Sequence, residues 1–104
     1  MNNDLAQTEA LLTELKKQTK TSNAAVMVAP TFTNLWQSHL ALKGTDIEVI
    51  AQNMHFAKNG AFTGEISAEQ LKDFDVQWVL IGHSERRNVY GETDAQVAAK
   101  VAKA

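Results

Sequence analysis

The densest group of side chains that could do chemistry lies in residues 78–94, WVLIGHSERRNVYGETD. An apolar run ends at Gly82, and His83 follows directly, with Glu85 and two arginines close behind. In parallel α/β folds, side chains that follow the strands converge at the carboxyl ends of the sheet, where helix N-termini also offer backbone N–H groups. A helical turn that starts near Ser84 would direct such N–H groups at the imidazole and hold it neutral. A neutral imidazole can donate a hydrogen bond to a carbonyl oxygen of a substrate.

The same residues also allow a purely structural interpretation. His83 would then only cap a strand, and the charged side chains behind it would form ion pairs at the protein surface, made by Glu85, Arg86 and Arg87. Spacing alone leaves both interpretations open.

Composition and charge limit the classes of protein to which the chain can belong. Its 104 residues fit one small domain, and a net charge of -2 gives no general attraction to nucleic acid or to anionic membranes. The sequence has no cysteine, which excludes disulfides, thiolate metal sites and a cysteine nucleophile, and which agrees with a reducing compartment. No apolar run approaches the roughly 18 residues that a membrane span needs, and the first ten residues lack the order of a secretory signal. We therefore expect a cytoplasmic protein.

Hydrophobic periodicity predicts four helices that alternate with three strands. The first helix has an apolar line of leucines and Asn3 as its cap, whereas the third and fourth begin with the capping-box spacing of Ser67 with Gln70 and of Thr93 with Gln96. Leu71 and Phe74 are expected to pack beneath the third helix, and Val97 and Val101 beneath the fourth. The predicted elements are helix 3–20, strand 24–30, helix 34–42, strand 47–53, helix 67–74, strand 78–81 and a helix after Thr93.

This order predicts βα units and a parallel sheet. Three parallel strands would leave two unpaired edges, and the first helix has no preceding strand of its own, so the domain looks incomplete. The connection over residues 54–64 is too long for a plain connector and is a candidate interface.

Several separate motifs occur together in the chain: AQN, NGAFTGEIS, GHSERR and YGETD. In this order and at these separations they resemble the triosephosphate isomerase family. The resemblance implies an α/β protein, a segment of a (β/α)8 TIM barrel with parallel strands. Residues 1–104 would form a single partial TIM-barrel domain, from the first helix of the barrel to the fourth, without its first strand and its C-terminal half.

The resemblance also implies an activity and a role for particular residues. The family interconverts dihydroxyacetone phosphate and glyceraldehyde 3-phosphate through an enediol, in glycolysis and gluconeogenesis, without a cofactor. His83 would be the electrophilic catalyst, Glu85 a buried carboxylate near the active-site lysine, and Ser84 a neighbour of the catalytic glutamate. Thr63, at the tip of the long loop, would reach across a homodimer interface and brace the partner's active site, and Asn53 with the loop around it would shape that contact.

Other parts of the family pattern are missing from these 104 residues or have a different role. Arg86, Arg87 and Glu92 are expected to hold the barrel together by ion pairs. The lysine that neutralises the substrate phosphate, the glutamate base, the mobile lid and the phosphate-binding glycines have no counterpart here. Because the general base supplies much of the catalysis, we expect this chain alone to be inactive.

Two other classes of protein remain as alternatives. The first is a non-catalytic barrel fragment that acts as a scaffold or assembles with complementary segments. The second, a flavodoxin-like binding domain, is disfavoured because no phosphate loop follows any predicted strand.

The remaining histidines and the tryptophans predict no further site. His39 and His55 are not spaced with a third ligand, so we expect no metal and two solvated side chains. Trp36 and Trp78 lack a surrounding basic stripe, which argues against nucleic acid as a partner and favours a packing role.

Overall fold

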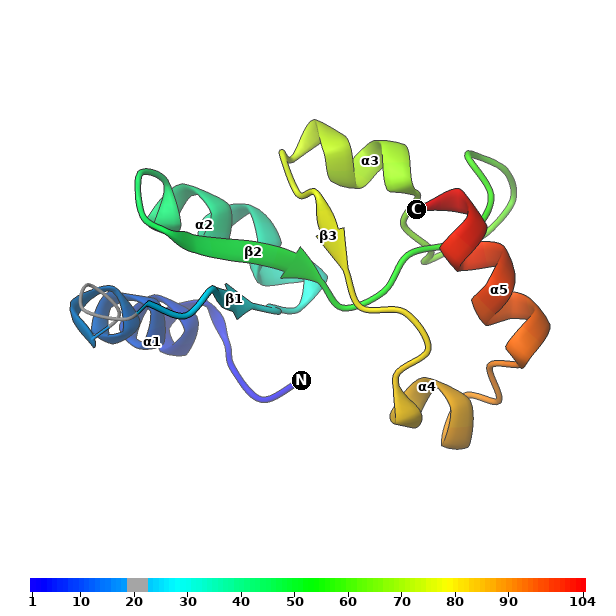
Figure 1. Cartoon of the computed structure of the whole chain (residues 1–104), viewed down its shortest axis with the longest axis horizontal. Helices are drawn as coiled ribbons and strands as arrows, with labels where there is room; N and C mark the ends of the chain where they lie inside the picture. Colours follow the sequence, from blue (N-terminus) through cyan, green and yellow to red (C-terminus); the bar gives the residue numbers. More distant parts are fainter. Residues whose placement is uncertain (19–22) are drawn as a thin grey trace.

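The structure, a computed structural model, describes residues 1–18 and 23–104. Figure 1 shows α1 beside β1 and α2 beside β2 at one end, with α3, α4 and α5 around the other end of the sheet. In chain order the elements are α1 (Leu5–Gln18), β1 (Val26–Val28), α2 (Phe32–Leu42), β2 (Ile47–Ala51), α3 (Ala68–Asp73), β3 (Trp78–Val79), α4 (Ser84–Asn88) and α5 (Asp94–Lys103).

The three strands form the predicted parallel sheet, in the order β1-β2-β3. Val26 lies opposite Ile47, and Ile50 lies opposite Trp78. In the part of the chain that the structure describes, β1 and β3 are the edge strands and pair only with β2. The expectation of a parallel α/β sheet with two open edges is therefore confirmed for the described residues.

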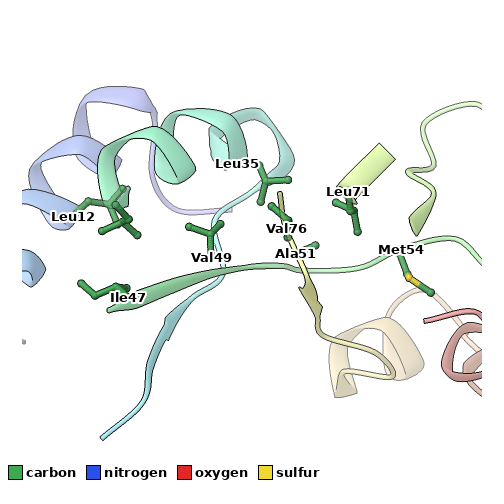
Figure 2. Close-up of a cluster of buried hydrophobic side chains, with 9 residues drawn as sticks. Leu12, Leu35, Ile47, Val49, Ala51, Met54, Leu71 and Val76 are labelled. Carbon is green, nitrogen blue, oxygen red and sulfur yellow. The ribbon is translucent and has the colours of Figure 1, made fainter. Parts of the chain in front are cut away.

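Only one face of this sheet is covered by helices. Ile47, Val49 and Ala51 alternate along β2 toward the core, where they meet Leu12 of α1 and Leu35 of α2 (Figure 2). Because neighbours in register point to the same side of a sheet, the opposite face carries Met27, Trp78 and Leu80. These three side chains are 42%, 53% and 39% exposed. The second face is thus mainly apolar, with the exposed Glu48 opposite Met27, and it is uncovered by the described residues.

The first helix begins later than predicted and has a different cap. It covers Leu5–Gln18, and the predicted continuation over residues 19 and 20 lies outside the described residues. Asp4, not Asn3, caps it: the Gln7 N–H donates to Asp4 Oδ1 at 2.8 Å, and the Asp4 N–H donates to Gln7 Oε1 at 3.0 Å. A carboxylate is a stronger acceptor for these N–H groups than an amide oxygen. Leu12 is buried, whereas Leu5 and Leu11 are about half exposed, so the packed stripe is narrower than expected.

Both predicted capping boxes are present. The Ser67 hydroxyl accepts from the Gln70 N–H at 3.2 Å and the Gln70 side chain accepts from the Ser67 N–H at 2.9 Å, and Thr93 and Gln96 repeat the arrangement at the start of α5. Leu71 is buried as predicted. Phe74, at the end of α3, packs edge-on against Trp36 of α2 at a centroid distance of 5.4 Å, although 39% of it stays exposed. Val101 is 61% exposed, so the packing predicted for this side chain is wrong.

The cap of α3 can be tested against a matched position that lacks the hydrogen bond. Ser67→Ala should lower the free energy of unfolding by about 1 kcal/mol, because it leaves the Gln70 N–H without its acceptor. Thr31 stands at the same position of α2 but makes no capping hydrogen bond, so Thr31→Ala should cost less than about 0.5 kcal/mol. Urea unfolding followed by circular dichroism measures both. Equal losses in the two variants would show that the cap does not stabilise the fold.

Candidate active site

His83 lies where β3 gives way to α4, as the sequence predicted. It is the N-cap residue of α4, and its Nδ1 accepts a hydrogen bond from the Glu85 N–H at 3.2 Å. A ring nitrogen that accepts a hydrogen bond carries no proton, so this contact favours the tautomer with the proton on Nε2. The Glu85 carboxylate is 3.9 Å from Nδ1, too far for a hydrogen bond that would compete. The imidazole is half exposed and free to donate from Nε2.

A hollow of about 300 Å³ opens beside this imidazole, at the carboxyl ends of all three strands. Ala29 and Phe32 line it after β1, Gln52 after β2, and His83 after β3. Parallel strands bring their carboxyl ends to one edge of the sheet, and that edge is where parallel α/β proteins hold their ligands. The position of the hollow therefore agrees with a catalytic role for His83.

Ser84 and Glu85 follow His83 at the start of α4, and of the two only Glu85 lines the hollow. Ser84 is exposed at the start of α4. Glu85 lines the hollow, but its side chain is 78% exposed, so the expectation of a buried carboxylate is wrong for this chain. The physical reason is that no described element covers the outer side of α4 at this position.

The long loop folds back on itself around a histidine. The His55 ring lies between the rings of Phe56 and Phe62, with centroid distances of 4.3 and 4.2 Å, and its Nδ1 is 3.6 Å from Glu65 Oε2. His55 is 14% exposed, so the expectation of a solvated side chain is wrong. Thr63 is exposed next to this cluster, as a residue that contacts a partner would have to be.

The base of that loop is tied into the interior by a polar network. Asn53 is buried, and its Oδ1 accepts a hydrogen bond from Lys100 Nζ of α5 at 2.8 Å. Lys100 also forms an ion pair with Glu92, and Glu92 Oε1 lies 3.4 Å from Arg86 Nε of α4. Asn53 therefore holds the loop from inside the chain, so any influence on a dimer contact would act through the loop.

The ion pairs expected of the arginines and Glu92 are present. Arg86 pairs with Glu92, and Arg87 pairs with Asp94 while its Nε donates to the Gly82 carbonyl at 3.1 Å. Burial of Glu92 opposes its ionisation, but the hydrogen bond from Lys100, the charge of that lysine and the Arg86 guanidinium together hold the pKa of Glu92 below its usual value.

Sequence reasoning missed Lys100, the most buried charged residue of the network. Lys100 is 3% exposed on α5, three residues after the half-buried Val97. The available signal was a lysine within the apolar stripe of a helix, with the acid Glu92, already expected to form ion pairs, just before that helix.

Residues 1–18 and 23–104 contain neither a candidate metal site nor a candidate membrane-spanning helix. No group of three or more histidine, cysteine, aspartate or glutamate side chains is arranged to hold a metal ion in these segments. None of their helices is long and apolar enough to cross a membrane.

The fold and the site together define a parallel α/β protein with a histidine at the carboxyl ends of its strands, as in a segment of a (β/α)8 barrel. The sequence model described as triosephosphate isomerase matches residues 1–104. The triosephosphate isomerase of Flavobacterium johnsoniae is 54% identical over 102 residues, which are 97% of this chain and 41% of the relative. That of Alkaliphilus metalliredigens is 46% identical over 104 residues, 100% of this chain and 42% of the relative. The chain belongs to the triosephosphate isomerase family, and it spans about two fifths of the length of the curated relatives it matches.

The glycine before His83 provides a test of how the site is held. Gly82 has φ +69°, and an added Cβ would lie 3.0 Å from Val97 Cγ1 of α5. Gly91 has φ +70° with no atom within 4 Å of its Cβ position. Gly82→Ala and Gly91→Ala therefore impose the same backbone strain, but only the first also crowds α5. We expect Gly82→Ala to lower the free energy of unfolding by roughly 1–2 kcal/mol more than Gly91→Ala in urea titrations. A smaller loss for Gly82→Ala would contradict the close packing.

The lowered pKa of Glu92 predicts a pH dependence of stability. The ionised carboxylate stabilises the folded chain fully above its unfolded pKa of about 4.3, and this contribution is lost as the pH falls through the lower, folded pKa. Glu92→Gln should therefore reduce the free energy of unfolding at pH 7 and flatten its decline below about pH 4.5. Urea unfolding at several pH values between 3 and 7 gives both curves. Parallel curves for the wild type and Glu92→Gln would show that the ion pair makes no such contribution.

Proposed function

We propose that this chain provides the electrophilic half of a triosephosphate isomerase site, which interconverts dihydroxyacetone phosphate and glyceraldehyde 3-phosphate. The observation that carries this proposal is the position of His83 beside the hollow, where its Nδ1 accepts from the Glu85 N–H and leaves Nε2 to act as a donor. A cytoplasmic role in glycolysis and gluconeogenesis follows from that activity and stays a prediction.

In this reaction His83 acts through its position, as a hydrogen-bond donor to the substrate. A neutral imidazole that polarises the substrate carbonyl, paired with a glutamate base, is the arrangement known for this family. The Nε2–H would donate to the carbonyl oxygen, and the donated hydrogen bond would stabilise negative charge as a proton leaves the adjacent carbon. No metal or cofactor is required for this step.

The other predicted site residues take supporting roles in this proposal. Glu85 lies at the rim of the hollow, where a lysine from the completed barrel could approach it, and the exposed Ser84 lies where the catalytic glutamate could rest. Thr63 would brace a partner's site across a homodimer interface, with Asn53 fixing the base of its loop.

We further propose that residues 1–104 form one partial barrel domain whose activity depends on segments outside this sequence. The 104 residues contain no counterpart of the glutamate base, and general acid–base catalysis contributes typically about 10²–10⁴-fold. Turnover by this chain alone should accordingly be far below that of a complete enzyme.

A second candidate, a non-catalytic segment that assembles with complementary barrel segments, is favoured by the uncovered sheet face. Met27, Trp78 and Leu80 expose an apolar surface there, and both neighbouring edges are open in the described part of the chain. Parallel sheets are normally covered on both faces, so this surface favours association.

A chimera tests the catalytic proposal. The chain replaces the matching 102 residues of the Flavobacterium johnsoniae triosephosphate isomerase, with which it is 54% identical. We expect the chimera to isomerise glyceraldehyde 3-phosphate in a coupled assay, and His83→Gln to lower kcat by about 100-fold or more because the carbonyl loses its donor.

His39→Gln is the matched control, since His39 lies on α2 stacked against Trp36 and away from the hollow. It should leave kcat within about twofold of the unmodified chimera. An active chimera that tolerates His83→Gln would refute the proposed role. If the chain binds the complementary segment of the relative in light scattering but gives no turnover as complex or chimera, the second candidate holds.

A further inference from the structure

The helix that carries the proposed catalytic histidine cannot hold its own position. α4 has five residues, far fewer than an isolated helix needs to be stable in water. Its place must therefore be fixed by contacts with other elements. Two contacts of this kind come from its arginines, which pair with Glu92 and with Asp94.

The contact through Glu92 connects α4 to the buried ammonium group of Lys100. Glu92 accepts from Arg86 and forms an ion pair with Lys100, and the side chains of Glu92 and Lys100 are only 5% and 4% exposed. The Glu92 N–H also donates to the Arg86 carbonyl at 2.9 Å, so the backbone after α4 is joined to the same group. A buried ion pair of this kind holds its partners in one geometry, because separation would leave an uncompensated charge.

The ammonium group of Lys100 also contacts the base of the long loop that follows β2. Lys100 Nζ donates to Asn53 Oδ1 at 2.8 Å, and Asn53 is buried two residues after the end of β2. Lys100 is thus the one described side chain that hydrogen-bonds both to the base of the loop and to the Glu92–Arg86 pair. The loop continues through His55 to Thr63.

We propose that Lys100 is a positioning residue for His83: by joining Asn53 to Glu92 and Arg86, it fixes α4, and hence the imidazole, relative to the loop that carries Thr63. Loss of its ammonium group would release α4 from this anchor and let the five-residue helix fray at its first turn, which weakens the Glu85 N–H bond to Nδ1 and misaligns the Nε2 donor. The inference rests on the proposed function for its kinetic consequence, but its structural consequence does not depend on activity.

Lys103 provides a matched control on the same helix. Its Nζ lies 2.5 Å from Glu69 Oε1, which joins α5 to α3 and contacts neither α4 nor Asn53. Lys100→Met and Lys103→Met therefore each remove one lysine ion pair from α5. Only Lys100→Met also removes the contacts with Glu92 and Asn53 that connect α5 to α4 and the loop. Asn53→Ala is a third variant, which removes the arm to the loop and leaves the pair between Lys100 and Glu92 in place.

The first measurement is nitrogen NMR of the His83 imidazole in this chain. A ring held in the Nε2–H form gives two well-separated nitrogen resonances, and release of Nδ1 mixes the tautomers and brings the resonances together. We expect this convergence in Lys100→Met, a smaller one in Asn53→Ala, and none in Lys103→Met. The second measurement is kinetics in the chimera, where Lys100→Met should lower kcat at least about tenfold with KM within twofold.

Each result decides for or against the positioning role. Unchanged His83 resonances in Lys100→Met, or an equal change in Lys103→Met, would overturn it. If Lys100→Met does not fold, Asn53→Ala decides by the same readout, and unchanged resonances there overturn the proposal. An unmodified chimera without isomerase activity would count against the proposed function, whereas the imidazole resonances would still decide the role of Lys100.

Discussion

The structure depends on one constraint: a parallel sheet is stable when apolar layers cover it, and here helices cover only one of its faces. The core in Figure 2 lies between β2 and the helices α1, α2 and α3. The opposite face exposes Met27, Trp78 and Leu80. In a closed barrel such a face points inward and is filled by side chains from the other strands. The uncovered face of this sheet therefore favours the addition of further strands. Membership of the triosephosphate isomerase family indicates that these strands belong to a (β/α)8 barrel.

The candidate site follows from local chemistry at the end of β3. Gly82 adopts a left-handed backbone that brings the chain against Val97, and His83 then caps α4 with its ring nitrogen. An imidazole that caps a helix through Nδ1 is fixed in its neutral form by the same hydrogen bond that fixes its direction. One contact thereby orients the ring and favours one tautomer. The proposed role of Lys100 extends this argument to the ion pairs that join α4 to the rest of the chain.

Much of this could be predicted from the sequence, because local signals and the fold agree. The capping boxes at Ser67 and Thr93, the parallel order of the strands and the place of His83 all followed from short-range patterns. What escaped prediction depends on contacts distant in sequence. Lys100 meets Asn53 across 47 positions, and His55 is largely covered by a loop that closes on itself. The exposure of Val101 was missed because helical periodicity shows which side chains align but not what lies across from them. The burial of Glu85 was implied by the family resemblance and not by a local pattern, and in this chain its side chain is 78% exposed.

The closed loop after β2 has a consequence for recognition. The His55 ring is held between two phenylalanine rings. The backbone N–H of His55 donates to the Ile66 carbonyl at 2.8 Å, and the backbone N–H of Glu65 donates to the Phe62 carbonyl at 2.9 Å. The apex at Thr63 therefore has its shape before it meets any surface. A preorganised apex gives up little conformational entropy on association, so even a small area of contact can translate into a long-lived complex.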